Sequence, residues 1–137
     1  GYGMPLMIEP LVMQAPTEGA RYAVDGDAEK IVTLVRLARE MGADIVKADP
    51  TADATQFHRV AQAASCPVLV RGGGRENLQQ VFARSRVLLD QGAVGMVYGR
   101  NVYQHANPAA VVAALMAMIH EGTSAEAAWQ LYEKTGA

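Results

Sequence analysis

The sequence predicts an α/β fold in which parallel strands alternate with helices. Four short, almost continuously apolar runs are separated by segments whose apolar residues recur at helical spacing, and this alternation is typical of parallel βα units. Runs that are apolar throughout, rather than at every second residue, indicate strands that are buried on both faces, as parallel strands are. The expected order is β-α-β-α-β-α-β-α-α.

The elements follow in order along the chain. The strands are expected at 5–13 (PLMIEPLVM), 43–49 (ADIVKAD), 66–74 (CPVLVRGGG, with its loop) and 94–101 (VGMVYGRN). The helices are expected at 25–42, 51–65, 76–93 and 107–122, with a tail helix at about 123–135. Apolar residues define the inner faces of the first three helices, namely Ile31, Leu34, Val35, Ala38, Phe57, Val60, Ala61, Leu78, Val81, Phe82, Leu88 and Leu89.

Residues that cap helices set the expected boundaries. Asp25 or Asp27 can begin the first helix, and Thr51 or Asp53 the second. Gly42 stands where a glycine commonly ends a helix.

Two further caps are expected near the C-terminus. Asn107 followed by Pro108 is a favourable start for the fourth helix. Thr123 and Glu126 have the spacing of a capping box for the tail helix.

The composition is that of an ordinary globular domain. The 137 residues are 50% hydrophobic and 19% charged, with a net charge of −2, so neither a nucleic-acid surface nor a membrane span is expected. Cys66 is the single cysteine, which excludes an internal disulfide and favours a reducing, cytoplasmic location. The chain begins with Gly1, close to its first strand, which suggests a piece of something longer.

Two architectures are compatible with these units: an open doubly wound sheet and a (βα)8 barrel. A barrel requires eight strands and typically about 250 residues. The chain has four βα repeats and about half that length, so on the second alternative it is a single α/β unit belonging to a longer barrel domain.

The candidate functional residues lie where the strands end. In parallel α/β folds ligands gather at the carboxyl ends of the strands. The residues at those four ends are Glu9, Lys47, Arg71-Gly72-Gly73-Gly74 and Gly99-Arg100-Asn101.

Lys47 is unusual because it ends a buried strand. A desolvated amine is a nucleophile that forms Schiff bases with carbonyl compounds. The alternative is a lysine that reaches solvent, or that pairs with Asp49 or Asp44. Glu9 can serve in proton transfer, or can be a structural partner of Lys47 or Arg100.

The two glycine turns expose backbone N–H groups of the kind that bind phosphate. Each lies beside an arginine, Arg71 or Arg75 in the first turn and Arg100 in the second. The alternative is that the glycines only allow tight turns. No cluster of His, Cys, Asp and Glu has the spacing of a metal site, so no metal is expected.

The motifs PLMIEPLVM, GADIVKADPT, PVLVRGGG and VGMVYGRNVYQHANP, in this order, resemble the class I aldolases of the DeoC/LacD/FbaB superfamily. They are most similar to the archaeal-type fructose-bisphosphate aldolase (DhnA-like) branch. The resemblance implies a (βα)8 TIM barrel of which this chain is the C-terminal half, strands five to eight. It also implies a reaction that needs no cofactor.

The resemblance assigns a role to each candidate residue. Lys47 falls on the Schiff-base lysine. Gly72 and Gly73 fall on one phosphate-binding turn, and Gly99 and Arg100 on another. Glu9 falls on the acid of the tagatose-bisphosphate and sulfosugar aldolase branches. Where the archaeal fructose-bisphosphate branch has a tryptophan and a tyrosine, this sequence has neither.

The expected function is therefore a class I aldolase, a lyase acting on a phosphorylated ketose with dihydroxyacetone phosphate as donor. The alternatives are a transaldolase-like synthase or a thiolase of the same family, or a non-catalytic half-barrel that binds phosphorylated metabolites. A half-barrel leaves sheet edges open, so we expect either a homo-oligomer or association with an N-terminal half. Trp129, Leu131 and Tyr132 on the tail helix are candidates for an oligomer contact.

Overall fold

The structure is a computed structural model that describes residues 2–15, 22–73 and 76–136. Its strands are β1 (Met7–Ile8), β2 (Met13–Gln14), β3 (Ala23–Val24), β4 (Ile45–Ala48), β5 (Val68–Arg71) and β6 (Gly95–Val97). Its helices are α1 (Ala28–Glu40), the 3₁₀ turn η1 (Ala54–Gln56), α2 (Phe57–Ala64), α3 (Leu78–Asp90), α4 (Arg100–Tyr103), α5 (Pro108–His120) and α6 (Ala125–Gly136).

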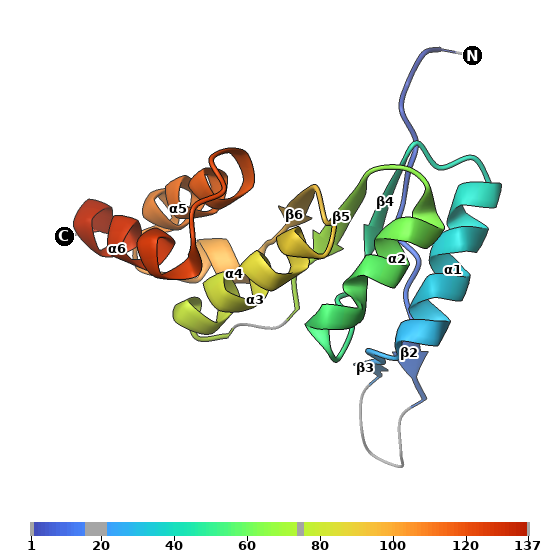
Figure 1. Cartoon of the computed structure of the whole chain (residues 1–137), viewed down its shortest axis with the longest axis horizontal. Helices are drawn as coiled ribbons and strands as arrows, with labels where there is room; N and C mark the ends of the chain where they lie inside the picture. The colour runs from blue at the N-terminus through green and yellow to red at the C-terminus, as the bar shows by residue number, and fades with distance from the viewer. Residues whose placement is uncertain (1, 16–21, 74–75, 137) are drawn as a thin grey trace.

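Four strands form one parallel sheet in the order β1-β4-β5-β6, which is also their order along the chain. Each successive connection within this sheet contains a helix, so the chain is a row of βα units (Figure 1). The predicted α/β class with parallel strands is confirmed.

The two faces of the sheet differ in burial. Val46 and Ala48 of β4, with Val68 and Val70 of β5, are fully buried in a cluster shared with α1 and α2. Alternate residues of the same strands, such as Lys47, are only half-buried. Because successive side chains of a strand point to opposite faces, the half-buried set belongs to the face away from α1 and α2.

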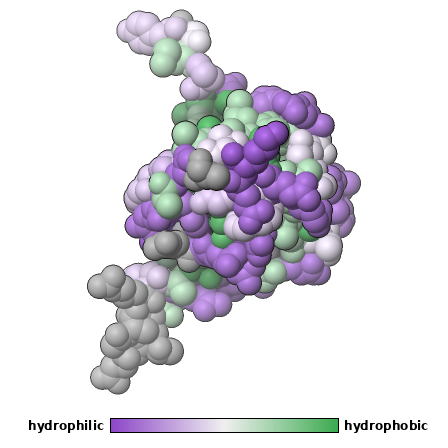
Figure 2. Space-filling model, turned by 90° about the vertical axis from the view of Figure 1, so that its left-hand side faces the viewer, coloured by the Kyte–Doolittle hydropathy of each residue, from purple (hydrophilic) through white to green (hydrophobic). Residues whose placement is uncertain are grey.

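A second cluster joins the C-terminal helices to α3. Phe82 of α3 packs with Val111 of α5 and Ala128 of α6, and its ring lies edge-on to Tyr132 at 6.5 Å between centroids. Trp129 packs on the same cluster. The C-terminal helices α5 and α6 lie at the end of the molecule opposite α1 (Figure 1). The face seen from that end is mainly hydrophilic with small hydrophobic areas (Figure 2). Trp129 and Tyr132 are therefore used in packing within the chain.

The helix boundaries resolve the alternative caps. Asp27 is the N-cap of α1 and accepts hydrogen bonds from the N–H groups of Glu29 and Lys30, whereas Asp25 accepts one from the N–H of Asp27. Asp53 caps η1.

The remaining expected helix ends are confirmed except at the tail. Asn107 caps α5, Pro108 lies in its first turn, and Gly42 follows α1 with φ of +95°. The tail prediction is wrong in one detail: Ser124, rather than Thr123, accepts the hydrogen bond from Ala127 N–H at the start of α6.

All four expected strands are shorter than predicted, and the first differs most. Only Met7 and Ile8 pair with β4, because Pro10 has no N–H to donate to a ladder. Met13 and Gln14 instead form a small antiparallel pair with β3. The fourth strand ends at Val97, and the expected strand residues Arg100 and Asn101 begin the short helix α4, whose first bonds are accepted by the carbonyl of Gly99.

Two of the predicted features lie outside the described residues, namely Gly74 and Arg75 of the first glycine turn. Of the helices in the described part of the chain, none combines the length and apolar character needed to cross a bilayer.

Candidate active site

The carboxyl ends of the parallel strands bring the predicted residues to one edge of the sheet. Ile8 is in register with Val46, so Glu9 and Lys47 follow as neighbours on β1 and β4. Ala48 is in register with Val70, which places Asp49 beside Arg71. The register therefore builds two adjacent pairs of charged residues.

Lys47 and Glu9 form the central pair. The Lys47 ammonium Nζ donates a hydrogen bond to Glu9 Oε2 at 2.9 Å. The Lys47 side chain is 19% exposed and that of Glu9 is 36% exposed, so both remain open to a ligand. Of the partners that the sequence allowed for Lys47, the structure selects Glu9. Asp44 instead accepts the N–H of Leu6 at 2.7 Å.

Arg71 extends this pair into a row of alternating charge. Its Nε lies 3.8 Å from Glu9 Oε1 and donates a hydrogen bond to Asp49 Oδ1. The Asp49 side chain is 1% exposed, and its Oδ2 has no hydrogen-bond partner among the described residues. Sequence reasoning missed this role of Asp49. The signal was present, since a residue two positions after Lys47 in an extended chain points to the same side as Lys47.

The first glycine turn follows β5 closely. Gly72 N–H donates to the carbonyl of Val97 at 3.0 Å. A Cβ atom at Gly72 would lie 3.0 Å from Cδ1 of Tyr98 and 3.2 Å from its Cα, so a side chain at residue 72 would force Tyr98 to move by a few tenths of an ångström. Burial raises the pKa of the Tyr98 hydroxyl, which is hydrogen-bonded to Ser85 Oγ at 3.0 Å.

The second glycine turn contacts the first. Arg100 is exposed, and its Nη2 donates to the carbonyl of Gly73 at 3.4 Å. Gly99 provides the carbonyl that begins α4. The helix expected at 76–93 is α3. Asn77 caps it, and its first residue is Leu78.

A cavity of about 380 Å³ lies beside the first glycine turn. Its wall includes Asp49, Arg71, Gly72 and Gly73, together with Arg84 of α3. Arg84 Nη1 is bonded to Glu76 Oε1 at 2.9 Å. No sequence pattern selects Arg84, because it occupies the middle of an amphipathic helix.

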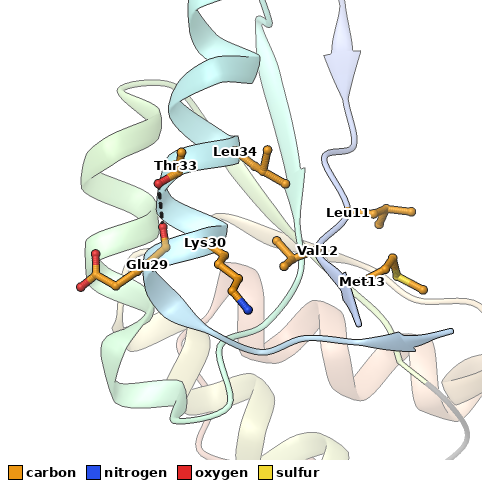
Figure 3. Close-up of a pocket in the computed structure, with 7 residues that line it drawn as sticks. All are labelled: Leu11, Val12, Met13, Glu29, Lys30, Thr33 and Leu34. Atoms are coloured by element: carbon orange, nitrogen blue, oxygen red, sulfur yellow. Dashed lines mark hydrogen bonds between the residues drawn. The ribbon is translucent and has the colours of Figure 1, made fainter. Parts of the chain in front are cut away.

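A separate surface groove lies between residues 11–13 and α1 (Figure 3). Lys30 of this groove is paired with Asp25 at 2.6 Å, and the Thr33 hydroxyl donates to the carbonyl of Glu29 at 2.9 Å. Its polar groups thus have partners within the chain. None of the residues at the four strand ends lines it, so the strand-end cluster is the better candidate for chemistry.

Parallel βα units with charged residues gathered at the carboxyl edge of the sheet are typical of α/β enzymes. The sequence model of the DeoC/LacD family aldolases matches residues 1–105, and the chain belongs to this family.

Curated relatives in this family carry several activities. An uncharacterized aldolase of Saccharolobus solfataricus is 39% identical over 88% of this chain and 43% of its own length. The 2-amino-3,7-dideoxy-D-threo-hept-6-ulosonate synthase of Halobacterium salinarum is 38% identical over 74% of this chain and 38% of its own length. The 3-hydroxy-5-phosphonooxypentane-2,4-dione thiolase of Photorhabdus laumondii is 30% identical over 96% of this chain and 42% of its own length.

Solved structures agree with this family. The crystal structure of an archaeal fructose 1,6-bisphosphate aldolase matches with a TM-score of 0.76 and 27% identity, over 88% of this chain and 47% of that chain. A Schiff-base-forming fructose-1,6-bisphosphate aldolase, solved for its reaction intermediates, matches with a TM-score of 0.75 and 27% identity. The match covers 87% of this chain and 46% of that chain. The chain spans about two fifths of the length of the curated relatives it matches.

Proposed function

We propose that this chain carries the catalytic half of a class I aldolase, in which Lys47 forms a Schiff base with a phosphorylated ketone. The observation that supports it most is the 2.9 Å hydrogen bond between Lys47 Nζ and Glu9 Oε2 at the carboxyl edge of the sheet. A structural neighbour at 27% identity is itself a Schiff-base-forming aldolase.

The proposed reaction begins when Glu9 accepts a proton from the Lys47 ammonium. The free amine attacks the ketone carbon, and Glu9 returns a proton to the resulting hydroxyl, which leaves as water. The protonated imine then receives the electron pair of the breaking C–C bond and becomes an enamine. The substrate hydroxyl that becomes the aldehyde gives its proton to Glu9. Glu9 then protonates the enamine carbon, and water hydrolyses the imine, which releases the ketone and restores the Lys47 amine. Condensation is the reverse sequence.

The proposed substrate is a phosphorylated ketose, with dihydroxyacetone phosphate as the ketone product. Gly73, with Gly99 and Arg100, would hold the phosphate. Gly72, whose own N–H is bonded to the Val97 carbonyl, would allow the two turns to approach each other. Arg100 suits this role because it is exposed and its bond to the Gly73 carbonyl is long, at 3.4 Å, so its guanidinium can turn to an anion.

The active barrel is proposed to contain more than this chain. Because the chain covers 43% of one relative and 47% of one structural neighbour, we propose that it supplies strands five to eight and that an N-terminal half completes the barrel. The complete protein would be a cytoplasmic homo-oligomer.

The relatives also support a second candidate reaction. The Halobacterium salinarum relative, at 38% identity, is named as a synthase, and the Photorhabdus laumondii relative as a thiolase. A synthase reaction can retain the Lys47 imine and change the acceptor. A non-catalytic half-barrel that binds phosphorylated metabolites is the third candidate, and it would form no imine.

Reductive trapping tests the proposal. The complete barrel and this chain alone are incubated with dihydroxyacetone phosphate and borohydride, and their intact masses are measured. We expect one irreversible adduct in the barrel, lost in Lys47→Ala and kept in Lys134→Ala, which removes an exposed lysine of α6. An adduct in the barrel alone means that the N-terminal half is required. No adduct with this ketone in either protein contradicts the aldolase proposal.

A further inference from the structure

The side chain of Asn101 links the two glycine turns from the interior. It is the second residue of α4, and the residue is 1% exposed. Its Oδ1 accepts a hydrogen bond from the backbone N–H of Glu76 at 3.0 Å, across 25 residues of sequence. Since a backbone N–H can only donate, this bond fixes which end of the amide faces Glu76.

The other two contacts between the turns have different properties. The bond from Gly72 N–H to the Val97 carbonyl continues the β5–β6 ladder and holds only the first residue of the turn. The bond from Arg100 to the Gly73 carbonyl is long and made by an exposed side chain. Arg100 can exchange this carbonyl for a ligand, whereas Asn101 cannot leave Glu76 without burying an unpaired N–H.

Glu76 is also held on its other side. Its Oε1 binds Arg84 Nη1 of α3 at 2.9 Å, while its backbone binds Asn101 of α4. Glu76 is therefore fixed between two helices. The Asn101 Nδ2 is buried without an acceptor in the part of the chain that the structure describes, so the bond accepted by Oδ1 from Glu76 is the hydrogen bond that this side chain makes there.

We infer that Asn101 is a positioning residue. By holding Glu76 against α4, it keeps Gly72 and Gly73 beside the turn at 99–100, and so sets the preference of the site for a phosphorylated over a non-phosphorylated ketone. This inference rests on the proposed function. Backbone N–H groups bind phosphate only when they converge, so loosening one turn weakens the anion site. Lys47 lies on β4, which β5 separates from β6, so imine formation itself does not depend on this contact.

The test compares two ketones in the complete barrel. The rate of borohydride trapping is measured against the concentration of dihydroxyacetone phosphate and of dihydroxyacetone. In Asn101→Leu we expect the half-saturating concentration to rise at least about tenfold for the phosphorylated ketone, with less than about twofold change in its maximal rate or in trapping of dihydroxyacetone. Val60→Ala, a buried substitution in α2 remote from both turns, is the control and should leave the trapping of both ketones unchanged.

The inference is overturned if the half-saturating concentration rises equally for both ketones in Asn101→Leu, or if it rises for neither. If Asn101→Leu does not fold, Asn101→Ser replaces it, because the shorter side chain cannot reach Glu76 N–H from the same backbone position. If the wild-type barrel traps neither ketone, the proposed function fails, and calorimetry with inorganic phosphate alone decides the inference. The inference then requires that phosphate binds at least about tenfold more weakly to the variant than to the wild type. Equal affinity in the two proteins, or no binding to either, overturns the inference.

Discussion

Arg71 and Asp49 form an ion pair at the ends of neighbouring strands, in which the carboxylate is almost excluded from solvent. The Asp49 side chain is 1% exposed and that of Arg71 is 20% exposed. Because Arg71 also lies 3.8 Å from Glu9, this buried carboxylate orients the cation that faces the lysine–glutamate pair.

Asp49→Ala should destabilise the protein by roughly 2–4 kcal/mol, somewhat less than the loss of one partner from a fully buried pair, because Arg71 is partly exposed. The measurement is the free energy of unfolding from urea denaturation. Glu40→Ala is the matched control. It breaks the exposed pair of Arg36 and Glu40 on α1 and should cost less than about 0.5 kcal/mol. Equal costs for the two variants would contradict the structural role assigned to Asp49.

Gly72→Ala should disturb the site more than Gly73→Ala. A Cβ at residue 72 meets the ring and Cα of Tyr98 at 3.0 and 3.2 Å, whereas at residue 73 the nearest atom is Glu76 Oε1, a flexible side-chain end, at 3.7 Å. Overpacking of this kind costs about 1–3 kcal/mol. Thermal unfolding and the half-saturating concentration of dihydroxyacetone phosphate are measured for both variants. A larger loss of thermal stability or of ketone affinity in Gly73→Ala than in Gly72→Ala would contradict this prediction.

Ser124→Ala should destabilise the chain by about 1 kcal/mol, the usual cost of removing an N-cap. The Ser124 hydroxyl accepts the N–H of Ala127, and hydrogen bonds from Ser124 and from its own backbone N–H lower the pKa of Glu126 in the same first turn. Thr123→Ala is the control and should have a smaller effect. Urea denaturation distinguishes the two, and a larger loss for Thr123→Ala would restore the capping box that the sequence predicted.

The pair of Asp25 and Lys30 predicts a pH dependence. The hydrogen bond from Lys30 lowers the pKa of Asp25 below 3.8, and that from Asp25 raises the pKa of Lys30 above 10.5. The depressed carboxyl stabilises the fold above pH 3.8, and this contribution is lost as pH falls through the lowered value. The raised amine stabilises it below pH 10.5, and this contribution is lost as pH rises through the raised value.

Asp25→Asn should therefore lower the free energy of unfolding by a constant amount near neutral pH, and the difference from wild type should shrink at both extremes. The measurement is urea denaturation across the pH range. A difference that does not vary between neutral pH and pH 3 would show that the ion pair contributes nothing to stability.

The fold and the gathering of the candidate site residues at one edge of the sheet could be predicted from the sequence, because both depend on local patterns. Alternating apolar runs predict parallel strands, and parallel strands place Lys47 and the glycine turns at one edge. The choice between Glu9 and the nearby aspartates as partner of Lys47 was open, because it depends on the register between strands 38 residues apart.

Contacts between distant segments account for what the sequence did not predict. The bond from Glu76 N–H to Asn101 joins a backbone group, which no residue type reveals, to a side chain 25 residues away. The short β1 and the small β2–β3 pair depend on Pro10 ending a ladder in the middle of a run that otherwise has strand character. The helix α4 begins at Arg100 because Gly99 is its N-cap, with backbone angles φ of −113° and ψ of −86° that end the preceding extended segment.

Glu9→Gln provides the sharpest test of the proposed chemistry. Glutamine keeps the size of the side chain and an oxygen that can accept from Lys47, but it cannot take a proton from the ammonium. Removing a positioned proton-transfer group typically slows a reaction about 10²–10⁴-fold. We expect the trapping rate with dihydroxyacetone phosphate to fall within that range while its half-saturating concentration changes little, because Glu9 does not belong to either glycine turn.

The matched control for this prediction is Glu29→Gln, which neutralises an exposed carboxylate of α1 that binds Arg59 and takes no part in the strand-end cluster. Its trapping rate should equal that of wild type. The pH profile of trapping separates the two roles that the sequence left open for Glu9. A proton-transfer role predicts that the rate in Glu9→Gln recovers as pH rises and free amine forms without help. A purely structural role predicts a lower free energy of unfolding in Glu9→Gln, with a trapping rate that falls by the same factor at every pH.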